Sequence, residues 1–273
     1  MNYRHSFHAG NIADVFKHAV LCRVLEALAR KDTPFAVLDS HAGAGAYRLK
    51  APGEFEQGIG QLWPEREHWP ALERYFTLIE RINGPGPLRD YPGSPLFIAE
   101  SLRAQDSAVL FERQHEECRA LRSALRGRKR IRIGAEDGWS GIKGFVPPPE
   151  NRGLVFVDPP YERADDFARI APALAQALKR WRNGIYLVWY PIKTRAPVEA
   201  LHAALATCGA PGYAVEFLTL PTDVEQRLNG SGLALLNPPW QLRETLAVML
   251  PPLATRLAGR DGRPQLRFRD YPG

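Results

Sequence analysis

In "VFVDPPYE", residues 155–162, a hydrophobic run leads into an aspartate, two prolines and a tyrosine. Prolines cannot donate hydrogen bonds within a sheet, so Pro159 and Pro160 are expected to end a strand abruptly. Asp158 then stands at the carboxyl end of that strand. In open α/β sheets, this is the edge at which ligands bind.

The same residues are suited to hold a flat ring that carries an amine. The carboxylate of Asp158 and the carbonyl of Pro159 offer two acceptors near one point, which match the two N–H donors of an exocyclic amino group. Tyr161 adds an aromatic face on which a base can stack. We therefore predict a catalytic clamp for a nucleobase amine at Asp158, Pro159 and Tyr161.

Outward from this stretch, strands and helices alternate along the chain. Seven apolar runs predict strands, at residues 35–39, 108–111, 131–133, 153–157, 184–190, 213–220 and 232–236. Helical stretches lie between most of them, at residues 114–126, 164–182, 195–207 and 241–258. The alternation predicts a Rossmann-like α/β fold, with a seven-stranded, mostly parallel sheet and helices on both of its faces. The charged, turn-rich tail, residues 259–273, is expected to be partly disordered.

One interval is too long for a single crossover between strands. Residues 40–107 separate the first two predicted strands, whereas one crossover helix needs far fewer. Residues 70–83 within this interval have their own helical periodicity. We therefore predict a main domain formed by residues 1–47 and 93–273, with a small helical insertion, residues 48–92, after the first strand.

Two helix starts can be predicted from their capping residues. Asn11 is expected to cap a helix over residues 11–31, because its side chain can accept a hydrogen bond from a backbone N–H of the first turn. Ser94 is expected to act in the same way for the helix that returns the chain to the main domain. Pro95 would then occupy the first helical position, where its missing N–H costs nothing.

The composition excludes several classes of protein. The 273 residues are 45% hydrophobic and 24% charged, which is typical of a globular protein with a substantial core. Cys22, Cys118 and Cys208 lie far apart, so neither a disulfide framework nor a zinc site is expected. No apolar run could span a bilayer, and the N-terminus lacks the apolar core of a signal peptide. The 36 basic residues exceed the 30 acidic ones, and this formal charge of +6 favours an anionic partner such as nucleic acid.

The first three predicted strands are followed by residues that suit a nucleoside. Gly43, in the loop after the first strand, lets the backbone approach a ligand closely. Glu112, after the second, can accept hydrogen bonds from both ribose hydroxyls. Asp137 and Gly138, after the third, can offer an acceptor and a backbone N–H to an adenine edge. Each feature alone is also common at ordinary turns. Arg48 stands where a dinucleotide fingerprint has its third glycine, which disfavours an oxidoreductase.

Several blocks of the sequence resemble one known family. They are "YRHSFHAGNIADVFKH" (3–18), "LDSHAGAG" (38–45), "YPGSP" (91–95), "DPPYE" (158–162), "GIYLVWYPI" (184–192) and "NPPW" (237–240). Together they resemble the RlmJ family of bacterial 23S ribosomal RNA adenine-N6 methyltransferases, from residue 2 to about residue 258. The resemblance implies a class I methyltransferase fold with a helical insertion after the first strand. It also implies S-adenosyl-L-methionine as cofactor and 23S ribosomal RNA as partner.

The resemblance also implies roles for individual residues. The implied cofactor contacts are Lys17, His18, His41, Ser94, Glu112, Asp137, Gly138 and Asp158. Tyr3 falls where the family contacts its RNA. Arg4 beside it suits the same role on chemical grounds, because aromatic rings stack on unpaired bases and a cation neutralises phosphate. The alternative for this N-terminal stretch is an arm that packs on the domain for stability.

Two other patterns could carry chemistry. His5, His8 and His18 could be imagined as a metal site, but no cysteine or paired carboxylate completes the set, so no metal is predicted. The "NPPW" motif, residues 237–240, also follows an apolar run. It lies after the seventh predicted strand, away from the expected crevice, so Asp158 is preferred as the catalytic acid. Trp240 is then expected to pack or to contact RNA.

We therefore predict methylation of N6 of a specific adenine in 23S ribosomal RNA by a cytoplasmic monomer. Catalysis would consist mainly of positioning, with the base extruded from its stack and Asp158 close enough to take up the amine proton. The alternatives are an amino-group methyltransferase that acts on DNA adenine or on guanine in ribosomal RNA, and an inactive RNA-binding protein with this fold. The presence of Asp158, Glu112 and the glycine loop argues against the inactive protein, because binding alone does not need them.

Overall fold

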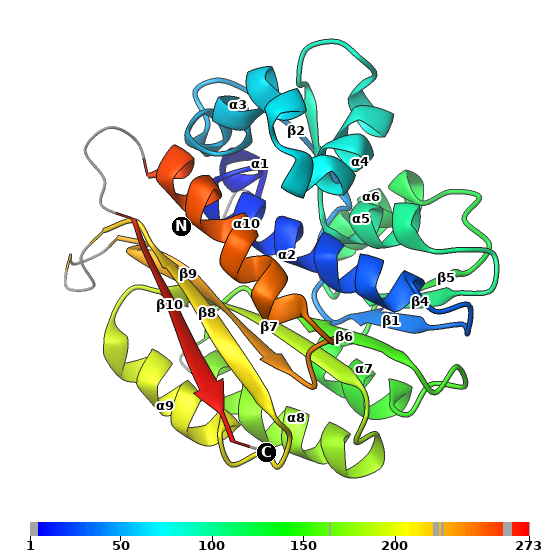
Figure 1. Cartoon of the computed structure of the whole chain (residues 1–273). Coiled ribbons are helices and arrows are strands. Elements are labelled where there is room, and N and C mark those ends of the chain that lie inside the picture. The colour runs from blue at the N-terminus through cyan, green and yellow to red at the C-terminus, as the bar shows by residue number, and fades with distance from the viewer. Residues whose placement is uncertain (1–4, 164, 221–223, 225–226, 259–263, 273) are drawn as a thin grey trace.

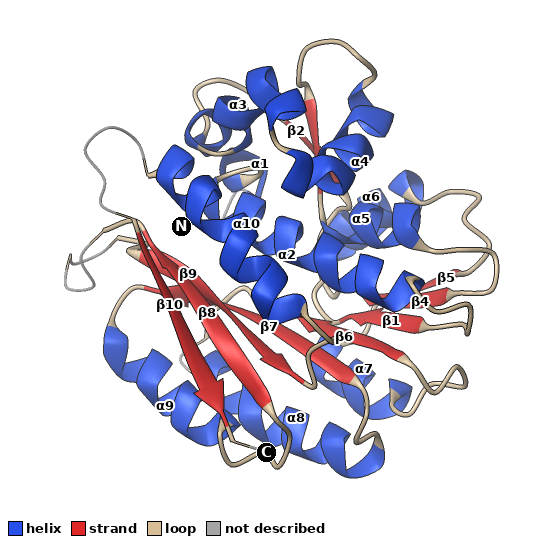
Figure 2. Cartoon of the chain, in the orientation of Figure 1, coloured by secondary structure: helices blue, strands red, loops and turns tan. Residues whose placement is uncertain are grey.

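A twisted sheet runs through the molecule and separates two layers of helices (Figures 1 and 2). The computed structural model describes residues 5–163, 165–220, 224, 227–258 and 264–272. In this part of the chain the sheet has eight strands: β1 (Ala36–Asp39), β4 (Ser107–Phe111), β5 (Ile131–Gly134), β6 (Gly153–Val157), β7 (Ile185–Ile192), β8 (Gly212–Leu218), β9 (Gly230–Leu236) and β10 (Gln265–Tyr271). Their order across the sheet is β10-β8-β9-β7-β6-β1-β4-β5.

The sheet is mostly parallel, as expected. Strands β5, β4, β1, β6 and β7 pair in parallel, whereas β9 pairs antiparallel with both β7 and β8. Helices cover both faces of the parallel part, and its central strands are therefore continuous apolar runs. Every residue of β6, "GLVFV", is buried. The carboxyl ends of the parallel strands consequently meet at one edge of the sheet.

The expectation of seven strands is wrong, because the described residues include an eighth, β10. It lies in the tail that was expected to be partly disordered, and it pairs antiparallel with β8 along its whole length. Leu266 and Phe268 face the core, while Arg267 and Arg269, which alternate with them, are exposed. This alternation is that of a strand with one solvated face. The charged residues of the outer face concealed it in the sequence.

The helices form one layer on each face of the sheet. One layer contains α2 (Ile12–Ala29), α4 (Glu73–Asn83), α5 (Ser94–Ser101), α6 (His115–Ala124) and α10 (Leu242–Leu257), and the other contains α7 (Gly138–Phe145), α8 (Asp166–Arg180) and α9 (Arg195–Leu205). Each layer buries its own apolar cluster against the sheet. Phe16 and Leu21 of α2 are buried in the first cluster, and Ile170 of α8 is buried in the second.

The two predicted helix starts have different outcomes. The side chain of Asn11 caps α2 by accepting a hydrogen bond from the backbone N–H of Asp14, at 2.9 Å, so this prediction is confirmed. The prediction that Ser94 is an N-cap is wrong. Gly93 occupies the cap position of α5, and Ser94 is its first helical residue. The hydroxyl of Ser94 donates instead to Asp39 at the end of β1, at 2.6 Å.

A largely helical segment lies between β1 and β4. The short strands β2 (Ala46–Arg48) and β3 (Asp90–Pro92) pair antiparallel and bring its two ends together. Between them lie α3 (Ile59–Leu62), α4 and three 3₁₀ turns (Glu54–Gln57, Trp63–His68 and Pro70–Leu72). Helix α4 contacts α2 and α5, so the segment covers part of the same face of the sheet. Its treatment as a separate domain, residues 48–92, stays a prediction. The short helix α1 (His5–His8) precedes α2.

Candidate active site

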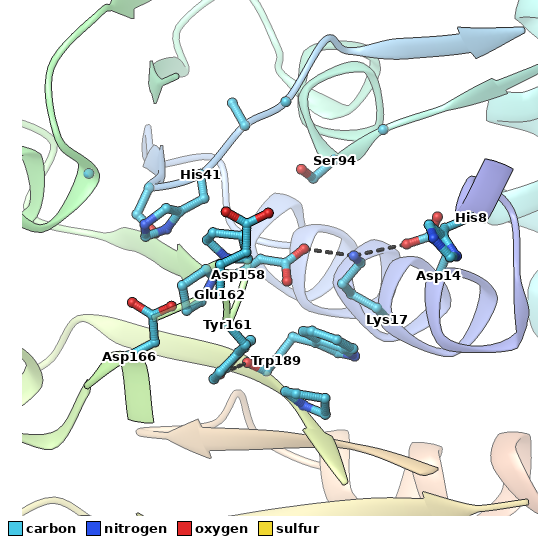
Figure 3. A pocket seen from close by; sticks show the side chains of 18 of the residues that line it. His8, Asp14, Lys17, His41, Ser94, Asp158, Tyr161, Glu162, Asp166 and Trp189 are labelled. Atoms are coloured by element: carbon cyan, nitrogen blue, oxygen red, sulfur yellow. Dashed lines mark hydrogen bonds and ion pairs between the residues drawn. The ribbon is translucent and has the colours of Figure 1, made fainter. Parts of the chain in front are cut away.

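A cavity of about 730 Å³ lies where the parallel strands end (Figure 3). Its walls come from the segments that follow β1, β4, β5 and β6, from β7, and from the first half of α2. The predicted site residues that line it are Lys17, His18, His41, Gly43, Ser94, Glu112, Asp137, Gly138, Asp158, Pro159 and Tyr161. Tyr3 and Arg4 lie outside the described residues. The fold thus gathers at one place side chains that are spread over most of the chain.

Lys17 holds the aspartate of the "DPPY" motif in place. Its Nζ lies 2.6 Å from Oδ2 of Asp158 and 2.9 Å from Oδ1 of Asp14, and the three groups are mostly buried (Figure 3). Burial alone would lower the pKa of this ammonium group, but the charges of Asp14 and Asp158 outweigh burial and raise the pKa well above its usual value. Lys17 therefore stays charged. It also lies 5.2 Å from the ring centre of Trp189, another residue of the cavity wall.

Asp39, the last residue of β1, is a member of this cluster that the sequence reasoning did not select. It is fully buried, and it accepts hydrogen bonds from the hydroxyl of Ser94 at 2.6 Å and from the backbone N–H of His41 at 3.3 Å. Burial raises its pKa to about 7, and the charge of Asp158 acts in the same direction. Asp39 is therefore protonated in mildly acidic solution. Its position at the end of a predicted strand was the signal that could have found it.

Two histidines of the cavity are neutral. Nδ1 of His18 lies 2.9 Å from the hydroxyl of Tyr91, and burial lowers the pKa of His18 to about 3. Burial likewise lowers the pKa of His41 to about 4. The ring of His41 contacts Trp139 edge-on, with 5.4 Å between the ring centres. Both histidines therefore offer uncharged rings and hydrogen-bonding nitrogens to a ligand at neutral pH.

Glu112 anchors the glycine loop that follows β1. Gly43 has a φ of +66°, and its N–H donates to Oε2 of Glu112 at 2.8 Å. The N–H of Gln114 donates to Oε1 at 2.7 Å. A carboxylate oxygen can accept more than one hydrogen bond, so these contacts leave Glu112 capacity for a diol. A Cβ at Gly43 would lie 2.2 Å from the hydroxyl of Tyr47, so a side chain there would displace the Tyr47 ring as well as strain the backbone at this positive φ.

The start of α7 passes unusually close to the loop after β1. A Cβ on Gly138 would lie 1.8 Å from the carbonyl oxygen of Ser40, so only glycine fits at this position. Asp137 precedes the helix, and its carboxylate makes no capping hydrogen bond. It lies 3.5 Å from the guanidinium of Arg169, which stands 5.2 Å from the ring centre of Trp139. The carboxylate of Asp137 therefore belongs to the cavity wall and not to the helix start.

Tyr161 is held rigidly in an uncommon backbone conformation. Its φ of +52° lies in the left-handed region, which a bulky residue rarely adopts outside functional sites. The hydroxyl of Tyr161 donates to the carbonyl of Trp189 (Figure 3). The ring packs against Phe167, at 4.7 Å between centres, and against Trp189, at 5.7 Å. Tyr161 and Trp189 together form a fixed aromatic wall beside Asp158.

The second proline motif lies elsewhere. Strand β9 runs antiparallel to β7, so the carboxyl end of β9 is at the sheet edge opposite the cavity. The side-chain amide of Asn237 donates there to the carbonyls of Arg182 at 2.6 Å and Gly184 at 2.9 Å. Its amide is thus used in joining two loops. Trp240 is 84% exposed, so it does not pack on the protein, and its contact with RNA stays a prediction.

The described part of the chain also bears on metal sites, membrane-spanning helices and disulfides. No group of three or more His, Cys, Asp or Glu side chains there is arranged to hold a metal ion. None of the helices in these residues has the length and apolar character needed to cross a bilayer. Cys22 and Cys118 are buried and Cys208 is half-buried, and none of them forms a disulfide.

Comparison with known proteins supports a ribosomal RNA methyltransferase. The family model described as "Ribosomal RNA large subunit methyltransferase D, RlmJ" matches residues 32–269. Proteins named ribosomal RNA large subunit methyltransferase J from Escherichia coli (strain K12) and Haemophilus influenzae are each 38% identical to this chain, over 94% of it and 94% of their own length. A crystal structure of a Legionella pneumophila protein has a TM-score of 0.90 at 34% identity, and the match covers 96% of this chain and 98% of that one.

Proposed function

The chain belongs to the RlmJ family of large-subunit ribosomal RNA methyltransferases, and on this premise we propose that it methylates N6 of a specific adenine in 23S ribosomal RNA. S-adenosylmethionine is the methyl donor. The observation that carries the proposal is the cavity itself, which combines the Asp-Pro-Pro-Tyr clamp with nucleoside-type groups after three neighbouring strands. A protein that only binds RNA would not need both halves of this cavity.

The residues of the cavity fit S-adenosylmethionine. Glu112 would accept hydrogen bonds from the ribose, while Asp137 and the N–H of Gly138 would meet the adenine edge. Glycines at positions 43 and 138 carry no side chain, so the backbone there can approach a ligand closely. Lys17 would face the methionine carboxylate. When bound, the cofactor supplies an electrophilic methyl group on a sulfonium centre.

The remaining chemistry is positioning by the chain's own groups. The adenine amine is a weak nucleophile because its lone pair is delocalised into the ring. Asp158 and the Pro159 carbonyl would accept its two N–H groups and so direct the lone pair toward the methyl group. Lys17 keeps Asp158 oriented through their ion pair. As the carbon–nitrogen bond forms, the carbon–sulfur bond of the donor would break, with its electron pair left on sulfur. The amine nitrogen would then be strongly acidic, and Asp158 or water would take up its proton. The base must leave its stack to reach this point, where Tyr161 supplies a wall.

The partner and the compartment follow from this substrate. Ribosomal RNA lies in the cytoplasm of bacteria, so we place the protein there. The predicted site residues from Lys17 to Tyr161 already meet in one cavity of a single chain, and we propose that the protein acts as a monomer. Light scattering coupled to size-exclusion chromatography measures this directly, and a stable dimer would contradict it.

The proposal can be tested with purified protein, S-adenosylmethionine and 23S ribosomal RNA from cells that lack the gene. Mass mapping should find N6-methyladenosine at one position, with much slower transfer to DNA. Asp158→Ala should abolish transfer, because it removes one of the two acceptors of the amine, and circular dichroism should show an intact fold. Asp32→Ala, at an exposed position before β1, is the matched control and should transfer at the normal rate. A methylated guanine, equal activity on DNA, or substantial activity of the folded Asp158→Ala protein would overturn the proposal.

A further inference from the structure

The positive charge of the protein is concentrated in one segment. Residues 113–132 contain eight arginines and lysines and two glutamates, so their formal charge equals the +6 of the whole chain. The rest of the chain is neutral overall. The segment comprises α6, β5 and the residues that join them, at one end of the sheet (Figure 1). Its buried residues, Cys118, Leu121 and Leu125, are apolar, so packing does not account for the charge.

Three arginines lie on one side, the arginine face, of α6 and of the turn that follows it. Arg119 and Arg122 of α6 and Arg126, two residues after the end of the helix, are spaced by three and four residues. Together with Glu116 they line a shallow depression on the surface, and all three arginines are exposed. The guanidinium of Arg122 donates to the carbonyl of Ile133 at 2.9 Å. This contact ties α6 to β5, the edge strand of the sheet, so the helix, the strand and the cationic residues between them are held together.

Most of this charge is not neutralised by the protein itself. Among the described residues, no carboxylate lies within ion-pair distance of Arg119, Arg126 or Lys129, whereas Arg128 is paired with Glu100. Cations that face solvent side by side repel one another, and this repulsion destabilises the compact state unless an anion is bound. Charges along β5 alone could serve to prevent pairing with another sheet. That role would not require arginines on the helix.

We propose that α6 and β5 form a second RNA-binding surface, which binds the phosphate backbone of ribosomal RNA outside the cavity. The inference rests on the proposed function. Arg113 lines the cavity, and α6 begins two residues later and extends about 15 Å away from it. An RNA strand whose target base lies in the cavity can therefore continue across the arginine face. Such a surface adds affinity without reading the sequence.

The test compares two triple variants that remove the same charge from opposite faces of the sheet. Arg119→Gln, Arg126→Gln and Lys129→Gln together change the proposed surface. Lys143→Gln, Lys179→Gln and Arg182→Gln change exposed residues at the other face and serve as the control. In methyl transfer to 23S ribosomal RNA, the first variant should raise KM by about tenfold or more, and the slope of log KM against log salt should fall by about three. Its kcat and its affinity for S-adenosylmethionine should not change, and the control should stay within about twofold of the wild type.

The outcomes separate this inference from the proposed function. Equal increases in KM for the two variants would mean a general charge effect and would refute the surface. A normal KM for the first variant would refute it as well. Melting temperatures of both variants exclude unfolding as the cause. If the wild type transfers no methyl group to ribosomal RNA, the proposed function fails. Filter binding of the same variants to that RNA then still decides whether the surface binds it.

Discussion

Replacing Asp39 with asparagine should remove a large part of the pH dependence of the protein's stability. Asp39 is fully buried beneath the cavity and accepts hydrogen bonds from the Ser94 hydroxyl and the His41 N–H. Its pKa is raised from 3.8 to about 7, mainly by burial. A carboxyl group whose pKa is higher in the folded state takes up a proton on folding at intermediate pH. The stability that it contributes is complete below pH 3.8 and is lost as the pH rises through about 7.

The magnitude follows from the two pKa values. Between pH 3.8 and 7 the unfolded carboxyl is ionised and the folded one is protonated, so each pH unit lowers the free energy of unfolding by about 1.4 kcal/mol. From pH 5 to pH 9, the wild type should therefore lose about 3 kcal/mol relative to Asp39→Asn. The side chain of asparagine has nearly the same shape as that of aspartate and does not ionise. The difference in the free energy of unfolding between the two proteins therefore isolates Asp39 from the other titrating residues.

Urea unfolding at one-unit steps from pH 5 to pH 9, at constant ionic strength, measures this difference. The lost or altered hydrogen bonds of asparagine shift all its values by a constant amount, so only the change with pH is interpreted. The free energy of unfolding of the wild type relative to Asp39→Asn should fall between pH 5 and 7 and stay constant above pH 8. Parallel curves for the two proteins would show that Asp39 ionises normally in the folded state, and the reasoning from burial would be refuted.

Three further predictions use matched substitutions. In urea unfolding, Gly138→Ala should lower the free energy of unfolding by about 3 kcal/mol or more, because the added Cβ would collide with a backbone carbonyl. Gly144→Ala in the same helix is the control. Its Cβ would meet nothing within 4 Å, so this change should be neutral or stabilising. Tyr271→Phe removes a 2.6 Å hydrogen bond between β10 and a buried histidine of α9 and should cost about 1–3 kcal/mol in the same assay. Tyr213→Phe, whose buried hydroxyl has no partner among the described residues, should cost almost nothing, and equal losses would contradict the assignment. Glu112→Ala should lower S-adenosylmethionine affinity about tenfold or more in calorimetry and leave RNA binding unchanged; unchanged cofactor affinity would remove Glu112 from the ribose site.

Most of the sheet could be predicted because its signals are local. A strand buried on both faces is a continuous apolar run bounded by turn residues, as in β1, β6 and β7. Strand β10 was missed because half of its residues are exposed and charged, and its partner β8 lies far away along the chain. Helix α7 was missed because it is short and contains three glycines, which disfavour helix in isolation. Its packing against the sheet stabilises it instead.

The residues of the candidate site likewise divide into those that the sequence could group and those that only the fold brings together. Residues that follow strands, such as Glu112 and Asp158, could be grouped in advance, because parallel strands end at one edge. Asp14 could also be placed beside Lys17, because side chains three residues apart in a helix share a face. Trp189 could not, because it belongs to the interior of a strand and no local pattern indicates that it lies near Lys17. The ion pair between Lys17 and Asp158 likewise joins positions 141 residues apart, a contact that only the folded chain defines.

The uneven charge of the chain has a consequence for the speed of encounter. The net charge of +6 lies in the segment around α6 and β5, and the rest of the chain is neutral overall, so the charge is centred away from the middle of the molecule. In the field of a polyanion, a molecule with such an uneven charge turns as it diffuses. Most first collisions with an RNA then occur at the β5 end of the sheet, and unproductive orientations are visited less often. The association rate should therefore fall more steeply with ionic strength than for a protein of the same net charge spread evenly over its surface.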